Sequence, residues 1–378
     1  MSAIRESSAF AVRLRALLRK EFRQMLRDRS NIMMGLLLPV ILIYILGFGI
    51  SFDIEQAPVA AVVEDHSVEA QRLVQGLSGS RYLSVVRAGS MPEAEALVQQ
   101  GKVHGILRIP PDFAENCGKG GAQAQLILNG VDAQNVRTVE GYVAAGIASW
   151  AAKELDRRGA SASGGVQVVQ RVWFNEPSIS TWFLVPGIIT LILTLIGAFL
   201  ASLLIAREWE RGTFESLFVT PVRPAEIVIA KVAPYACIGV ADIALCLLAA
   251  RFLFEVPVRG SIALIFLVSL LFLFVSLLLG LAISGLTRSQ FLASQVALLA
   301  SFLPSMMLSG FVFDIRNMPG WLVPVCNVLP ATHFMKLAKQ LFLAGNLWGD
   351  VAQGVLILTG YGLLFAFAAT KTLEKRLR

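Results

Sequence analysis

Long uncharged apolar runs recur along the whole chain. A helix that crosses a bilayer needs about 20 predominantly apolar residues. Runs of this size occupy residues 32–52, 177–206, 232–250, 260–287, 289–313 and 351–370. The third run contains one ionisable side chain, Asp242, and the fourth contains Gly280, Ser284 and Gly285, which suit close helix packing. The pattern predicts an α-helical polytopic membrane protein with six transmembrane helices.

A seventh uncharged stretch, 317–335, does not fit this pattern. It contains Pro319, Pro324 and Pro330, and a lipid-exposed helix cannot easily satisfy the backbone groups that three such breaks release. We therefore expect residues 314–350 to form an extracytoplasmic region, built from a re-entrant or interfacial pair of short helices.

The first 31 residues are polar and basic. Apolar side chains between residues 13 and 29 follow the three-and-four spacing of one helix face. Six basic residues cover the rest of this helix: Arg13, Arg15, Arg19, Lys20, Arg23 and Arg27. Such a helix lies in the headgroup plane, with its basic face toward anionic lipid. The alternative is a juxtamembrane helix that is simply solvated.

Residues 53–176, between the first two runs, have the pattern of a folded domain. Short apolar strand patterns at 58–64, 81–87, 103–109 and 125–128 alternate with helical stretches. A long helix from about Asp132 to Arg158 then leads back toward the second span. This alternation predicts a small α/β domain.

The charge distribution sets the expected orientation. Of the 378 residues, 56% are hydrophobic and 16% are charged, whereas soluble domains carry about 25% charge. The net charge of +7 does not indicate nucleic-acid binding, because much of the excess lies beside the apolar runs. Residues 1–31 and 371–378 are both basic, so both ends are expected in the cytoplasm. That requires an even number of spans and places residues 53–176 outside.

No catalytic or metal site is visible in the sequence. A G-x-x-x-x-G-K-[ST] phosphate motif is missing, so the chain is not expected to hydrolyse ATP. The three histidines are scattered and the four cysteines form no C-x-x-C pair. A disulfide between Cys117 and Cys326, which are expected in the same outer compartment, stays open. Asp242 allows two interpretations: a place on a substrate or proton path, or a carboxyl group that is protonated or bonded to neighbouring helices.

A cluster of charged residues, 207–221, directly follows the second apolar run. Gly212 permits a break, Thr213 is a suitable cap for a new helix, and Glu215 lies where a negative charge favours the helix dipole. Pro221 would end this short helix. Its apolar members share one face: Phe214, Leu217 and Phe218. We interpret it as a docking element.

The same residues resemble the cytoplasmic signature of ABC-2 type permeases, which reads roughly E-x-E-x-G-T-x-E-x-L-x-x-T-P. Its positions are filled here by Glu208, Glu210, Gly212, Thr213, Glu215, Leu217, Thr220 and Pro221. A second resemblance, over 308–313, 317–319 and 329–332, is to the outer re-entrant region before the family's last span. Together with the basic amphipathic start and the six spans, the resemblance covers essentially the whole chain.

The resemblance implies a permease subunit of an ATP-driven exporter in a bacterial inner membrane. Two permeases, identical or related, would pair above two separate ATPase subunits, and those subunits would hold ATP and magnesium, so this chain itself needs no cofactor. The loop 207–226, within the membrane part 177–378, would couple the two. The α/β domain resembles that of exporters with a large extracytoplasmic domain at this place, and a periplasmic adaptor is a further candidate partner.

Two other classes stay open. An α/β domain on a six-span base fits a sensor or scaffold that binds a ligand and signals inward without transport. A secondary transporter fits less well, because inverted repeats and several intramembrane charges are missing. The sequence does not select a cargo.

Overall fold

The chain folds into two compact units. The structure is a computed structural model that describes residues 2–49, 56–119, 122–128, 133–157, 179–214, 220–313, 315 and 318–373. One unit comprises Met1–Ile50 and Val172–Arg378, and the other comprises Ser51–Arg171. The second unit is therefore an insertion between the helix that ends at Gly49 and the helix that begins at Ser180.

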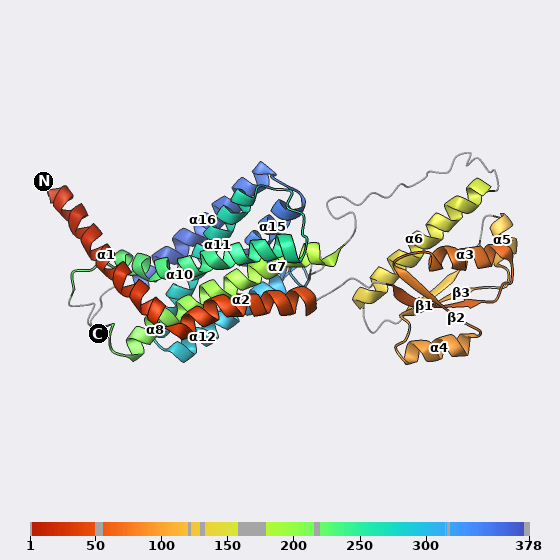
Figure 1. Cartoon of the computed structure of the whole chain (residues 1–378), viewed down its shortest axis with the longest axis horizontal. Coiled ribbons are helices and arrows are strands. Elements are labelled where there is room, and N and C mark those ends of the chain that lie inside the picture. Colours follow the sequence, from red (N-terminus) through yellow and green to blue (C-terminus); the bar gives the residue numbers. More distant parts are fainter. Residues whose placement is uncertain are drawn as a thin grey trace. The chain divides into compact units, whose positions relative to one another are not determined.

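The larger unit is a bundle of long helices (Figure 1). Its elements are α1 (Ser2–Arg27), α2 (Arg29–Gly49), α7 (Ser180–Thr194), η1 (Leu195–Leu200), α8 (Ala201–Glu210), α10 (Pro224–Leu248), η2 (Ala249–Leu253), α11 (Ile262–Thr287), α12 (Gln290–Ala297), η3 (Leu298–Phe302), α13 (Leu303–Leu308), α14 (Val323–Val328), α15 (Pro330–Leu343) and α16 (Trp348–Thr372). The η segments are π-helical turns that continue the α-helices beside them.

Six helical segments are long and apolar enough to cross a membrane, within the residues that the structure describes. This confirms the predicted number of spans. The proline-rich stretch forms α14 and α15, which have 6 and 14 residues, in place of a seventh span. Pro324 and Pro330 lie in the first turns of these helices, where a missing backbone N–H is harmless.

The amino-terminal helix is longer than predicted, since it begins at Ser2 and ends at Arg27. One residue, Asp28, separates it from the first span. The Asp28 carboxylate accepts a hydrogen bond from the backbone N–H of Asn31 at 3.3 Å, in the first turn of α2. Short polar side chains that bind the next backbone amides favour a helix start. Asp28 therefore marks the boundary between α1 and α2.

Small residues allow the central helices to approach closely. A Cβ atom at Gly280 of α11 would lie 2.3 Å from the backbone oxygen of Ala198 in η1. One turn along α11, the Ser284 hydroxyl accepts hydrogen bonds from the backbone N–H groups of Ile205 at 3.0 Å and Ala206 at 2.9 Å. The structure thus confirms the predicted close packing around Gly280.

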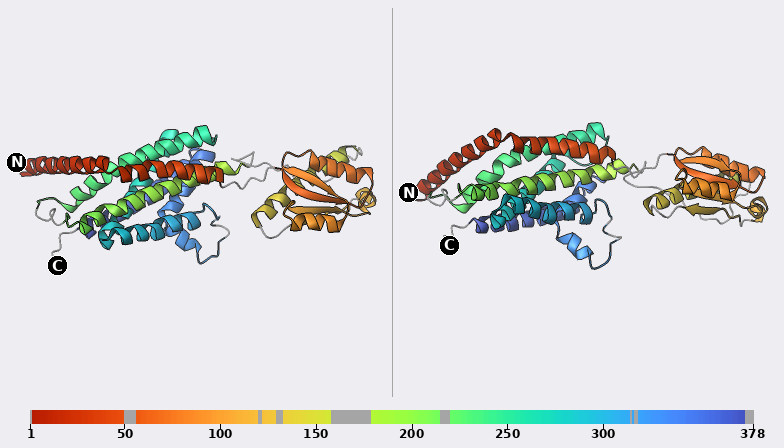
Figure 2. Two further views of the ribbon diagram at one scale, coloured as in Figure 1. Left: turned by 60° about the horizontal axis from the view of Figure 1, so that its bottom comes forward. Right: turned by 90° about the horizontal axis from the view of Figure 1, so that it is seen from below.

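The inserted unit has a four-stranded sheet with helices on both faces (Figure 2). Strands β1 (Ala57–Val63), β2 (Leu83–Ala88), β3 (Gly105–Ile109) and β4 (Gln125–Leu128) lie in the order β2-β1-β3-β4. β1 is parallel to β2 and β3, and β4 is antiparallel to β3. The helices are α3 (Val68–Ser78), α4 (Met91–Gln99), α5 (Phe113–Lys119) and α6 (Ala133–Arg157). All four predicted strands are present.

The central strand β1 is buried on both faces, which explains its uninterrupted apolar sequence. Val59 and Ala61 pack into one core cluster with side chains of α3 and α6. Ala60 and Val62 pack into another with Ala94 of α4.

Asp65 ties the end of β1 to the helices that follow. Its carboxylate accepts hydrogen bonds from the backbone N–H groups of Ser67 at 2.8 Å and Ala114 at 2.9 Å. Burial raises the pKa of this carboxyl, but the two backbone hydrogen bonds outweigh burial and hold the pKa below its ordinary value.

The close contact at Gly280 predicts a strong dependence on side-chain size. Gly280→Ala places a methyl group against the backbone of η1 and should cost about 1–3 kcal/mol of stability, measured as a lower thermal unfolding temperature of the purified protein. Gly360→Ala, in α16 with no atom near its Cβ position, is the matched control and should not lower stability. Equal unfolding temperatures for both variants would contradict the prediction.

Candidate functional site

Four charged side chains of alternating sign meet at one end of the helical bundle. Lys231 of α10 is 2% exposed, and its Nζ lies 2.9 Å from Oε2 of Glu208 on α8 and 3.3 Å from Oε1 of Glu21 on α1. The Nζ of Lys20 lies 2.8 Å from Oε1 of Glu208 and 3.1 Å from Oε1 of Glu21. Each acid therefore contacts both ammonium groups. We refer to these four residues as the charge cluster.

Burial makes the charge cluster costly to break. Removing one member of a buried ion pair leaves its partner charged and desolvated, at a cost of about 3–5 kcal/mol. Lys20 is the half-exposed member: burial lowers the pKa of its ammonium, but the hydrogen bond to Glu208 and the charges of both acids raise it above its ordinary value. Lys20 is therefore cationic at neutral pH. The charge cluster joins α1, α8 and α10.

Two ion pairs flank the charge cluster and join the same helices. Nη2 of Arg13 lies 2.8 Å from Oε1 of Glu226, which is fully buried at the start of α10. Oε2 of Glu226 accepts a hydrogen bond from the backbone N–H of Arg223 at 2.9 Å, which caps α10. On the other side, Arg207 of α8 pairs with Asp28, the residue between α1 and α2.

The last residue of α8, Glu210, binds the start of α12. Its Oε1 accepts hydrogen bonds from the backbone N–H of Gln290 at 2.8 Å and from the hydroxyl of Ser289 at 3.1 Å. A carboxylate is favourable at a helix amino terminus, where backbone N–H groups lack partners. Nearby, the Arg288 guanidinium lies 4.6 Å from the centre of the Trp209 ring. The end of α8 is thus attached to a fourth helix.

A tight turn follows α8. Gly212 has a φ of +67°, which favours glycine, and its N–H donates to the Trp209 carbonyl at 3.0 Å. The N–H and the hydroxyl of Thr213 both donate to the Glu208 carbonyl. Phe214 is buried against Trp209, with 4.9 Å between ring centres. The turn is therefore fixed to the helix that precedes it.

The structure describes six of the eight predicted coupling residues. Glu208 is buried in the charge cluster, whereas Glu210 is exposed and binds the start of α12. Gly212 makes the predicted break. Glu215 and Leu217, together with the predicted helix, lie outside the described residues. Thr220 is half-buried and Pro221 is exposed.

The predicted basic face of the amino-terminal helix divides into two. Arg13 forms an ion pair with Glu226 of α10, and Lys20 forms one with Glu208 of α8. The remaining four are exposed and follow a four-residue spacing along α1: Arg15, Arg19, Arg23 and Arg27. This stripe is the true basic face.

Asp242 lies away from the charge cluster, in the middle of α10. It is fully buried, and both carboxylate oxygens lack a hydrogen-bond partner among the described residues. Ser269 of α11 is also buried with an unpartnered hydroxyl. Cys326 of α14 is buried, and its thiol lies beside the sulfur of Met318. Within the described residues, no group of three or more His, Cys, Asp and Glu side chains is arranged to hold a metal ion.

The sequence did not identify Glu21, Glu226 and Lys231 as ion-pair partners between helices, although signals for two of them were present. Glu21 interrupts the apolar face of α1, four residues from Leu17 and Met25. Lys231 precedes an apolar run by one residue, and in the structure it lies inside the span. A charge on an otherwise apolar helix face indicates a buried partner on another helix.

Comparison with known proteins identifies the family of this chain. A family model described as "ABC-2 family transporter protein" matches residues 29–371. The chain belongs to this family. It is therefore a multi-pass membrane protein and a permease subunit of an ABC transporter.

Similar proteins of this family cover nearly the whole chain. "Probable multidrug ABC transporter permease YbhS" of Escherichia coli (strain K12) is 39% identical over 93% of this chain and 94% of that protein. "Probable multidrug ABC transporter permease YbhR" from the same strain is 28% identical, over 88% and 90%. "ABC transporter G family member 20" of Dictyostelium discoideum is 24% identical over 95% of this chain and 50% of that longer protein.

The charge cluster predicts how the permease responds to loss of one ammonium. Lys231→Met leaves two buried carboxylates with Lys20 alone and should lower stability by about 3–5 kcal/mol, seen as a lower unfolding temperature in detergent. Adding Glu208→Gln removes one unpaired charge and should restore part of the loss. Lys371→Met, at the exposed end of α16, is the control. An unfolding temperature that matches wild type in Lys231→Met would show that the charge cluster contributes little.

Proposed function

We propose that the permease works as a dimer in an ATP-driven exporter of the inner membrane, and that separate ATPase subunits act on it through the loop 207–226. The charged end of the bundle then faces the cytoplasm. The inserted α/β unit faces the opposite compartment, where an adaptor is a candidate partner. ATP and magnesium are held by the ATPase subunits.

One observation carries this proposal: the end of α8 is bound to α1, α10 and α12 by ion pairs and a helix cap. A force applied to the turn after α8 reaches all these helices, because none can shift without breaking an ion pair of the charge cluster or the cap that Glu210 forms on α12. Rigid elements with two discrete packings are the means by which a local push becomes a bundle rearrangement. Three residues beside the turn are exposed: Arg211, Gly212 and Pro221.

The orientation and the partner are supported by independent features. The basic residues of 1–31 and 371–378 favour the cytoplasmic side for both ends. A further relative, "Inner membrane transport permease YhhJ" of Escherichia coli (strain K12), is 27% identical over 92% of this chain. The Dictyostelium protein is called an ABC transporter and is about twice as long as the part that matches.

The coupling role predicts the effect of Gly212→Pro. Proline cannot adopt the φ of +67° and removes the N–H that bonds to Trp209, so the turn must rearrange. In cells that also produce the cognate ATPase, efflux of fluorescent drugs should fall at least about tenfold. The variant should still insert, bind the ATPase and permit ATP hydrolysis.

Gly349→Pro is the matched control, because it lies in the first turn of α16, where proline is tolerated. Normal efflux by Gly212→Pro would show that the turn is passive. Labelling of Thr213→Cys from outside the cell by an impermeant maleimide would contradict the orientation on which the proposal depends.

Asp242 is a candidate for the translocation path. Ionisable residues inside a span are costly and usually face the bundle interior or a partner, and Asp242 is buried without a hydrogen-bond partner in the described bundle. Asp242→Asn, which keeps the side-chain shape, should insert normally and reduce efflux at least about tenfold. Asp350→Asn, at the exposed start of α16, is the control. Wild-type efflux in Asp242→Asn would end this role.

A sensor or scaffold is the second candidate function, and a feature of the α/β unit favours it. A groove of about 630 Å³ between α3 and α6 is lined by the stacked rings of Tyr82 and Tyr142 and by Arg72, Lys153 and Arg157. Aromatic and cationic walls suit an anionic or aromatic ligand. Copurification of an ABC ATPase whose rate changes with the permease supports the exporter; its failure to copurify favours the sensor.

A further inference from the structure

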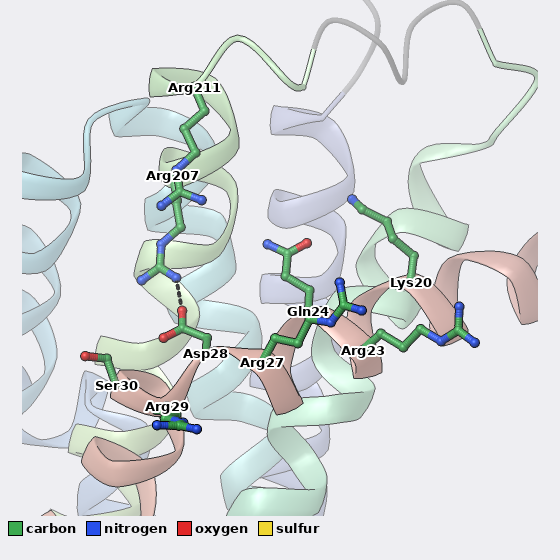
Figure 3. A pocket seen from close by; sticks show the side chains of 9 residues that line it. All are labelled: Lys20, Arg23, Gln24, Arg27, Asp28, Arg29, Ser30, Arg207 and Arg211. Carbon is green, nitrogen blue, oxygen red and sulfur yellow. Dashed lines mark hydrogen bonds and ion pairs between the residues drawn. The ribbon is translucent and has the colours of Figure 1, made fainter.

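A basic pocket lies where α1, α2 and the end of α8 meet. Its volume is about 710 Å³ and it opens to the surface. Figure 3 shows the side chains that line it, with the Asp28–Arg207 pair at one wall. Six cationic residues surround the space: Lys20, Arg23, Arg27, Arg29, Arg207 and Arg211.

The cations in this pocket exceed the anions that face them. Asp28 is the one carboxylate in the lining, and it is engaged by Arg207. Lys20 is engaged by Glu21 and Glu208. Four guanidinium groups therefore have no acidic partner within the described part of the chain: Arg23, Arg27, Arg29 and Arg211. Several unpaired guanidinium groups around one space favour a phosphate, which accepts their forked hydrogen bonds.

An apolar groove continues directly from the basic pocket along α2. Arg29 lines both spaces. The groove has a volume of about 480 Å³, and beyond Arg29 it is lined by aliphatic side chains and one thioether: Ile32, Met33, Leu36, Leu37 and Val40. Met33, Leu36, Leu37 and Val40 are exposed on the surface of this helix, which is the first membrane span.

We propose that the two spaces form one binding site for an anionic phospholipid. The phosphate of the headgroup lies among Arg23, Arg27 and Arg29, with Arg211 above it, and an acyl chain follows the groove on α2. A free phosphate uses the basic pocket alone and has no need of the groove. The junction of the polar start of α2 with its apolar part places the site at the level of lipid headgroups.

A lipid at this site has a consequence for the bundle. Its phosphate bridges the α1–α2 junction to Arg211, the first residue after α8. The lipid therefore adds a contact between the same elements that the Asp28–Arg207 pair already joins. This inference requires that the chain spans a membrane, and it does not depend on export or on an ATPase.

The test is lipid binding by the purified full-length permease in detergent, measured by native mass spectrometry. Phosphatidylglycerol should bind at least about tenfold more tightly than phosphatidylcholine of the same acyl chains. Arg23→Gln combined with Arg27→Gln should weaken phosphatidylglycerol binding by about 30-fold. Arg15→Gln combined with Arg19→Gln is the matched control, because these arginines are exposed on the same helix outside the pocket, and it should bind like wild type.

Further measurements distinguish a lipid headgroup phosphate from free inorganic phosphate in the pocket. Leu37→Trp fills the apolar groove without adding charge and should weaken phosphatidylglycerol binding at least about fivefold. Inorganic phosphate at millimolar concentration should not displace the lipid. Arg211→Gln, a loop variant, should weaken binding by about fivefold without affecting the α1–α2 junction.

Three results would overturn the proposal. If the Arg23→Gln/Arg27→Gln variant and the Arg15→Gln/Arg19→Gln variant lost the same affinity for phosphatidylglycerol, the lipid would be attracted diffusely to α1 and not held at a site. Displacement by inorganic phosphate, with no effect of Leu37→Trp, would show an anion pocket that takes no lipid. If the Arg23→Gln/Arg27→Gln variant and the Arg211→Gln variant both bound phosphatidylglycerol with wild-type affinity, the pocket would not bind the headgroup.

Discussion

The buried ammonium of Lys231 is the constraint on which the charged end of this permease depends. A desolvated charge is tolerated when opposite charges surround it, and the carboxylates of Glu208 and Glu21 come from two other helices. The positions of α1, α8 and α10 are therefore set by one electrostatic requirement. The Arg13–Glu226 and Asp28–Arg207 pairs extend the same requirement to the starts of α10 and α2.

Inside the bundle the constraint is of a different kind. Between spans in lipid there is no hydrophobic driving force, so close contact and backbone hydrogen bonds hold the helices together. Gly280 and Ser284 of α11 supply both where they meet η1 and α8. The ion pairs lie at one end of the helical bundle, whereas the close contact at Gly280 lies within the length of α11. A bundle fastened in this way can move as a set of rigid helices.

The membrane surface meets the protein at the same end. Arg23 and Arg27 of α1 and Arg29 at the start of α2 line one pocket with Arg211, which follows α8. In the proposed arrangement an ATPase reaches the loop from the aqueous side and a lipid phosphate reaches the pocket from the bilayer. Both then act on the junction that the Asp28–Arg207 pair closes.

The α/β unit has its own core on each face of its sheet.

The sequence by itself determined the number of spans, the four strands of the inserted unit and the break at Gly212. Each follows from local chemistry: apolar length, strand pattern, and a backbone conformation that favours glycine. Tertiary structure decided that Glu208 points inward, that Glu210 caps α12, and that Lys231 belongs to a span. It also decided where the π-helical turns fall. The identity of a carboxylate does not reveal its partner, because the partner comes from a distant part of the chain and is brought near only by packing.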